Sequence, residues 1–142
     1  MVWTKPESAE ARRKAATTAW VLLTLASMIL IGIGLARTMF FIWAPEPAML
    51  EKARIGGLYI NAGCVLSLAA GVWSHVRGNP VGVSVCVGLP GILVGWAALE
   101  DPYSLLRHLA AVVAFPFALA GVAEVIRVRG RRQRCLRVRW TI

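Results

Sequence analysis

Four long apolar stretches, separated by short polar segments, dominate the pattern along the chain. We expect them to form helices over residues 19–43, 54–76, 81–99 and 105–126. Each stretch has about the 17–25 residues that a helix needs to cross the hydrocarbon core of a bilayer. The pattern therefore predicts an all-α, polytopic membrane protein, with four transmembrane helices and short loops in a single domain of residues 1–142.

Proline and polar residues mark the segments between the apolar stretches. Residues 44–52 contain two prolines and are expected to form a loop, and Pro80 is well placed to start the third helix. Residues 1–18 form a polar lead-in, in which Thr4 and Glu7 match a capping box for a short amphipathic helix. Residues 127–142 form a basic tail.

Basic residues gather at one set of helix ends, and this bias predicts the orientation. Cytoplasmic segments of membrane proteins carry an excess of Lys and Arg. The predicted inner side holds Lys5, Arg12, Arg13, Lys14, Arg77 and the arginines of the tail, whereas the outer side holds Arg37, Lys52, Arg54 and Arg107. Both termini are therefore expected on the cytoplasmic side. Trp20, Trp73 and Trp140 fall near the inner boundary, as an aromatic belt requires.

Composition supports a lipid environment. The chain is 58% hydrophobic with a mean hydropathy of +0.64, whereas a soluble domain has roughly 45–50% apolar residues. The net charge of +9 could indicate nucleic acid, but the basic residues lie at the ends of apolar stretches. We therefore expect no nucleic-acid partner. The excess of Arg over Lys and the abundance of Ala suggest a GC-rich bacterial genome, and hence the bacterial cytoplasmic (inner) membrane.

No motif for catalysis, metal binding or a cofactor is recognisable. Cys64 and Cys86 are expected at different depths, which disfavours a disulfide, and they are interpreted as packing residues. His75 and His108 are expected at opposite membrane faces, so one chain cannot ligate a haem through both. The sequence predicts a non-enzyme without a bound cofactor.

Small residues recur at helical spacing and predict seams where helices pack closely. They are Gly63, Ser67 and Gly71 on the second helix, Gly91 and Gly95 on the third, and Ala110, Ala114 and Ala118 on the fourth. The seams could serve packing within this bundle, or one of them could dock a partner subunit.

Pro90 and Pro116 lie within the third and fourth helices. Each removes a backbone donor, so we expect a kink whose free carbonyls are satisfied by neighbouring groups. The kinks could be purely structural, or could act as a hinge or an ion-coordinating site.

Polar groups within or beside the predicted spans are candidates for a site because they are costly in lipid. They are Arg37, Asn61, Glu100, Asp101 and His108. Arg37, Asn61 and Glu100 could form one cluster. Alternatively, Arg37 reaches the headgroups, the acidic pair caps the next helix, and Asn61 bonds between helices.

The tail is expected to bind anionic lipid or a partner. Its candidate residues are Arg131, Arg132, Arg134, Arg137, Arg139 and Trp140, and each basic residue near an anionic surface contributes about 1 kcal/mol. From Leu136 to Ile142, apolar residues alternate with polar ones, which suits an extended strand with one apolar face.

These features favour a non-catalytic accessory or scaffold subunit of a larger bacterial membrane complex, of a respiratory or envelope-biogenesis type. Its partners would be membrane lipids and either another membrane protein or a second copy of itself. The alternative is a small oligomeric transporter or channel that uses the kinked helices and the polar residues at the outer end.

Overall fold

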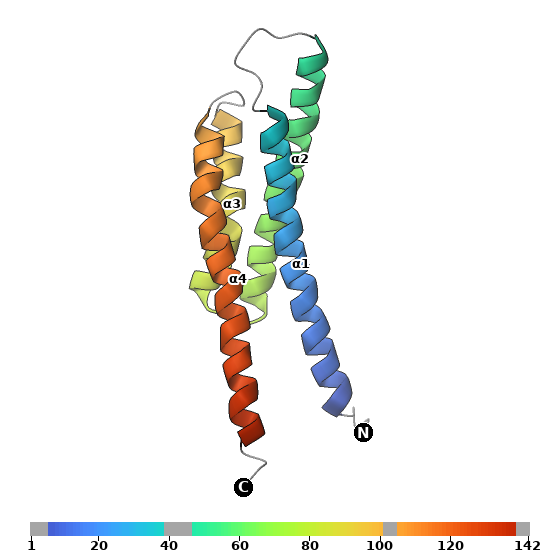
Figure 1. Ribbon diagram of the computed structural model, residues 1–142, viewed down its shortest axis with the longest axis vertical. Helices are drawn as coiled ribbons and strands as arrows, with labels where there is room; N and C mark the ends of the chain where they lie inside the picture. Colours follow the sequence, from blue (N-terminus) through green and yellow to red (C-terminus); the bar gives the residue numbers. More distant parts are fainter. Residues whose placement is uncertain (1–5, 39–46, 101–104, 139–142) are drawn as a thin grey trace.

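The computed structural model describes residues 6–38, 47–100 and 105–138, and this part of the chain is folded into four α-helices without a strand. Figure 1 shows them as long rods in one bundle. They are α1 (Pro6–Thr38), α2 (Pro47–Val76), α3 (Val81–Glu100) and α4 (Leu106–Val138). All four are long and apolar enough to cross a membrane. The prediction of an all-α architecture with four such helices is confirmed.

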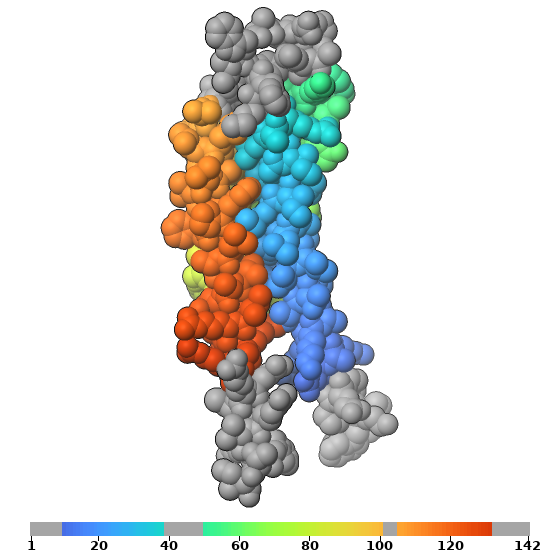
Figure 2. Space-filling view, viewed as in Figure 1, coloured from blue at the N-terminus to red at the C-terminus, as the bar shows by residue number. Residues whose placement is uncertain are grey.

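Each helix packs chiefly against its neighbour in the sequence. α1 lies on α2, α2 on α3 and α3 on α4, whereas α1 and α4 meet only sparsely. Figure 2 shows α1 and α4 side by side along one face. Both chain ends lie at the same end of the bundle (Figure 1).

The link between α2 and α3 is a closed turn. Gly78 has a φ of 73°, a left-handed conformation that glycine adopts without strain. Its N–H donates to His75 O at 2.9 Å, and the N–H of Asn79 donates to Ser74 O at 3.2 Å. These two bonds form a Schellman motif that ends α2. Val81 then begins α3 directly after Pro80, as predicted. We call this end of the bundle the turn end, and the opposite one the far end.

Two groups of buried side chains fill the interior. Near the turn end, Trp20 packs with residues of α2, α3 and α4. Towards the far end, Ile31 packs with residues of the same three helices. The first group is Trp20, Ala70, Val83, Val87, Val122 and Val125, and the second is Ile31, Leu35, Ile60, Cys64, Val94 and Ala111. All four helices therefore share one apolar interior.

The outward sides of the helices are apolar as well. Leu22 on α1, Val65 on α2, Trp96 on α3 and Val112 on α4 are each more than half exposed. This distribution is the reverse of that in a soluble helical domain, where the outward side is polar.

Three helix boundaries differ by more than one residue from those predicted: the starts of α1 and α2, and the end of α4. α1 begins at Pro6, so most of the lead-in continues the first helix, and α1 is described only to Thr38. α2 begins at Pro47 rather than residue 54, because proline is favourable in the first turn of a helix. The loop expected over residues 44–52 is thus helical from Pro47 onward, and residues 39–46 lie outside the described part.

α4 differs most, because it continues to Val138 instead of ending near residue 126. The extended strand expected from Leu136 is helical as far as Val138. Arginine is a good helix former, and a helix already under way adds each residue at little cost. The alternating polarity of Leu136, Arg137 and Val138 did not override that preference. Arg139 and Trp140 lie outside the described residues.

Candidate functional site

The best-defined polar contact inside the bundle lies where α2 crosses α3. Ser67 of α2 is fully buried, and its hydroxyl donates to Val87 O at 2.8 Å. Ser67 Oγ also accepts the N–H of Gly91 at 3.2 Å. In a regular helix, Gly91 N–H would donate to Val87 O. Ser67 therefore bridges the two backbone groups of the helical turn that contains Pro90.

The glycines of α2 bring the helix backbones close together. A Cβ added to Gly63 would lie 2.6 Å from Ile31 Cγ1 and 2.8 Å from Ser27 O, both on α1. A Cβ on Gly71 would instead lie 3.0 Å from Ser84 O of α3. The row predicted as one seam thus serves two interfaces: Gly63 faces α1, whereas Ser67 and Gly71 face α3.

The remaining small residues of the predicted seams lie at contacts within the bundle. Gly91 and Gly95 approach Cys64 of α2, while Ala114 and Ala118 are buried on α4. Ala110 is half-buried at the edge of the α3–α4 interface. Gly34 was not among the predicted seam residues, although a Cβ there would lie 2.7 Å from Gly56 O. The spacing from Gly34 to the next glycine of α1 did not suggest a row.

Cys64 and Cys86 are free thiols that pack against glycines. Cys64 lies against Gly91 and Gly95, and Cys86 lies against Gly121 of α4. Within residues 6–38, 47–100 and 105–138, no group of three His, Cys, Asp or Glu side chains is close enough to hold a metal ion.

The candidate polar residues do not form one cluster. Arg37 is exposed, and its guanidinium lies over the ring of Tyr59 at 5.1 Å, a cation–π contact between α1 and α2. Asn61 is exposed on the outward side of α2, and Glu100 is exposed at the last residue of α3. The described part shows the ion pairs Lys14–Glu10 and Arg54–Glu51, and neither of them involves Arg37 or Glu100. Asp101 lies outside the described residues.

Two adjacent residues at the start of α4, Arg107 and His108, are enclosed polar groups at the far end. Arg107 is only 4% exposed. His108 is half-buried, and its Nε2 lies 3.3 Å from Leu35 O of α1. Its Nδ1 is buried and has no hydrogen-bond partner among the described residues. The sequence analysis included His108 among the candidate site residues. It did not include Arg107, which was counted only among the basic residues of the outer side. Nothing in an apolar sequence distinguishes a buried arginine at a helix end from an exposed one.

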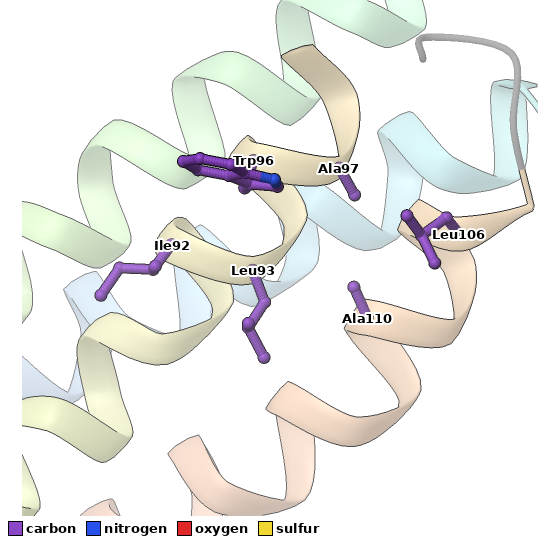
Figure 3. Close-up of a pocket in the computed structure, with 6 residues that line it drawn as sticks. All are labelled: Ile92, Leu93, Trp96, Ala97, Leu106 and Ala110. Carbon is purple, nitrogen blue, oxygen red and sulfur yellow. The ribbon is translucent and has the colours of Figure 1, made fainter. Parts of the chain in front are cut away.

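A shallow apolar groove lies between α3 and α4 near the far end. It has a volume of about 410 Å³ and is lined by Ile92, Leu93, Trp96, Ala97, Leu106 and Ala110. Figure 3 shows Leu93 and Ala97 of α3 facing Leu106 and Ala110 of α4. The lining offers almost no polar surface, so the groove suits an acyl chain or an apolar side chain rather than a polar substrate.

At the turn end, two side chains connect α1 to the α2–α3 hairpin through hydrogen bonds. Trp20 is 1% exposed and donates from Nε1 to Ala70 O at 3.0 Å. Arg77 donates from Nη1 to Ala16 O at 2.6 Å and from Nη2 to Thr17 Oγ1 at 3.3 Å. Trp20, expected in an interfacial belt, is therefore a buried core residue. Neither contact was predicted, because both depend on how the helices are rotated.

The basic tail is described only in part. Arg131 is exposed on α4. Arg132, Arg134 and Arg137 lie on the same helix, so the six candidate residues do not all lie on one extended strand. His75 and His108 lie at opposite ends of the bundle, as predicted, in the last turn of α2 and the first turn of α4.

Comparison of the chain with family models, curated proteins and solved structures finds no match. The fold and the contacts above define the class: a four-helix, all-α protein whose helices are compatible with a multi-pass membrane protein.

Proposed function

We propose that the chain is a multi-pass protein of a bacterial cytoplasmic membrane, with both termini in the cytoplasm, and that it acts as a non-catalytic accessory or scaffold subunit of a larger membrane complex. The observation that carries the proposal is the apolar outward side of all four helices, which surrounds an interior that is itself apolar and packed.

Energies favour lipid over water around these helices. Removing a Leu, Val or Ile side chain from water stabilises a folded protein by about 1.5–3 kcal/mol. The free energy of unfolding of a whole domain is only about 5–15 kcal/mol. Exposing the outward rows of four helices to water would offset that stability many times over. A bilayer removes the penalty without requiring any further packing.

The orientation follows from charge. Arg77 lies at the turn end with the lead-in and the tail, where Arg12, Arg13 and Arg131 are exposed. The projecting first turns of α2, at the far end, carry Glu51 as well as Lys52 and Arg54, and Arg54 pairs with Glu51. Lys and Arg near the ends of membrane helices favour the cytoplasmic side.

The packed interior supports a structural role rather than transport through a single bundle. Trp20, Ile31, Val87 and Val94 fill positions along the bundle and are at most 1% exposed. A solute path through that interior would require the helices to separate. Transport would therefore need several copies around a shared path, and no contact of the described residues favours it.

Extraction in a mild detergent from the native membrane, followed by native gel electrophoresis and mass spectrometry, tests the proposal. We expect the chain to migrate with at least one other membrane protein and to remain insoluble without detergent. Migration of this chain by itself, or only with further copies of itself, would remove the basis of the subunit role. Flux of ions or solutes through proteoliposomes would instead favour transport.

A further inference from the structure

The outward face of α2 carries an apolar row broken by one polar side chain. Its residues are exposed and follow one another at alternating steps of four and three positions. Such steps place side chains on one narrow stripe of a helix, the pattern that pairs helices in coiled coils. The row consists of Leu58, Asn61, Val65, Leu68 and Val72. Ala62 and Ala69, also exposed, flank it and allow another helix to approach closely.

Asn61 lacks a hydrogen-bond partner in the described part of the chain, although it lies within the apolar span of α2. The preceding residue, Ile60, packs against Gly34 of α1. Asn61 therefore sits at the level of the packed bundle, below the turns of α2 that project from the far end. An amide without a partner is costly in lipid.

Two other outward polar side chains beside the spans have contacts within the bundle, whereas Glu124 is exposed on α4. Arg37 stacks on Tyr59, and Thr18 donates to Lys14 O at 3.2 Å. The outward rows of α1 and α4, such as Ile29, Ile33 and Val112, are apolar, and lipid covers them without specificity. The face of α2 is different because its polar group is an uncharged amide set within an apolar row.

We propose that a second copy of this chain covers the outward face of α2, with the Asn61 amides of the two copies hydrogen-bonded to each other. A carboxamide is both a donor and an acceptor, so it is complementary to itself. Copies inserted in one orientation place Asn61 at the same depth, and the two-fold axis then runs along the membrane normal. This inference rests on the proposed membrane insertion. It makes the dimer the unit that a larger complex would contain.

Dimer formation can be measured by fluorescence energy transfer between copies of the full chain that carry a donor or an acceptor dye. The copies are placed in phosphatidylcholine vesicles at varied protein-to-lipid ratios. We expect Asn61→Leu to weaken association by roughly 5- to 30-fold, the effect of an interhelical hydrogen bond in lipid. Asn61→Gln keeps the amide and should restore most of the association. Val112→Leu, on the outward side of α4, is the matched control and should change nothing.

Cross-linking locates the interface. In a variant without native cysteines, Val65→Cys should form a disulfide between two copies, because equal positions meet across a two-fold axis. Ile29→Cys and Val112→Cys, equally outward on α1 and α4, should not. The proposal is overturned by a monomer at every ratio, by wild-type association of Asn61→Leu, or by Val65→Cys joining a different protein in native membranes. A monomer that stays helical in vesicles refutes the dimer alone, whereas a chain that dissolves without lipid refutes membrane insertion as well.

Discussion

The hydroxyl of Ser67 lies 2.8 Å from the carbonyl oxygen of Val87 and joins α2 to α3 at the turn that contains Pro90. Pro90 has no N–H to bond Cys86 O, and its ring crowds the preceding turn of α3, so polar groups of this turn need other partners. Ser67 provides both a donor and an acceptor there, since it also receives the N–H of Gly91. The small-residue seam and the turn that contains Pro90 are therefore parts of one contact.

Ser67→Ala removes both of these bonds within the apolar interior. We expect a loss of about 1–2 kcal/mol in the free energy of unfolding, because two backbone groups lose a buried partner. Denaturation in mixed micelles, followed by far-UV circular dichroism, measures it. Ser84→Ala is the matched control on α3, since the buried Ser84 hydroxyl has no partner in the part of the chain that the structure describes, and it should be neutral or stabilising. Equal losses for both variants would contradict this account.

Pro90→Ala should reduce the contribution of Ser67 to the free energy of unfolding. With alanine at position 90, α3 regains a backbone donor, and Gly91 N–H is free to bond Val87 O in a regular helix. Ser67→Ala should then cost less than in the wild type, with a coupling of at least about 0.5 kcal/mol. A double-mutant cycle of unfolding free energies measures the coupling. Strict additivity would show that the two residues act independently.

Gly63→Ala should destabilise the α1–α2 contact. The new Cβ would lie 2.6 Å from Ile31 Cγ1 and 2.8 Å from Ser27 O, so the helices must move apart. Overpacking of this kind costs about 1–3 kcal/mol, measurable by the same denaturation. Gly57→Ala is the control on the same helix, where nothing lies within 4 Å; the better helix propensity of alanine should leave stability equal or higher.

Trp20→Phe keeps an aromatic ring in the core but removes the Nε1–H that donates to Ala70 O. We expect a loss of about 1 kcal/mol of stability and a weaker attachment of α1 to α2. Trp96→Phe provides the comparison, because Trp96 is 65% exposed and should tolerate the change. Hydrogen exchange of the α1 amides near the turn end would report the loosening. A larger effect at Trp96 than at Trp20 would be inconsistent with the buried position of Trp20.

The proposed orientation can be checked with a membrane-impermeant maleimide on intact cells. In a variant without native cysteines, Lys52→Cys should react from outside, whereas Gly130→Cys should react only after permeabilisation. Both positions are exposed, and a Cβ at Gly130 meets nothing within 4 Å. Labelling of Gly130→Cys in intact cells would place the C-terminal end outside and reverse the topology.

The existence of the helices could be predicted, because runs of apolar residues of membrane length between prolines need no knowledge of partners. Their rotation about their own axes could not. Helices that are apolar on both the inward and the outward side have no polar face to set the rotation. The spacing thus grouped Gly63 with Gly71, but it could not show that Gly63 meets α1 and Gly71 meets α3. For the same reason, the sequence allowed Arg37 and Asn61 to share one cluster, whereas Arg37 lies over Tyr59 and Asn61 is exposed on the outward side of α2.

The ends of the helices were predicted less well. The prolines of residues 44–52 indicated a loop, whereas Pro47 occupies the first turn of α2. The arginines after residue 126 indicated the limit of the apolar span, but the limit of a span is not the end of a helix, and α4 continues to Val138. Hydrophobicity predicts the solvent around a segment, whereas backbone propensity decides how far the helix runs.

The order of packing, in which each helix rests mainly on the next one in the chain, has a consequence for assembly during synthesis. Neighbours that are close in sequence find each other quickly, because little chain entropy is lost when they meet. The pair joined through Gly78 can close before α4 has been made, and α4 then packs chiefly on α3. A growing chain of this design acquires its native contacts from the first helix to the last.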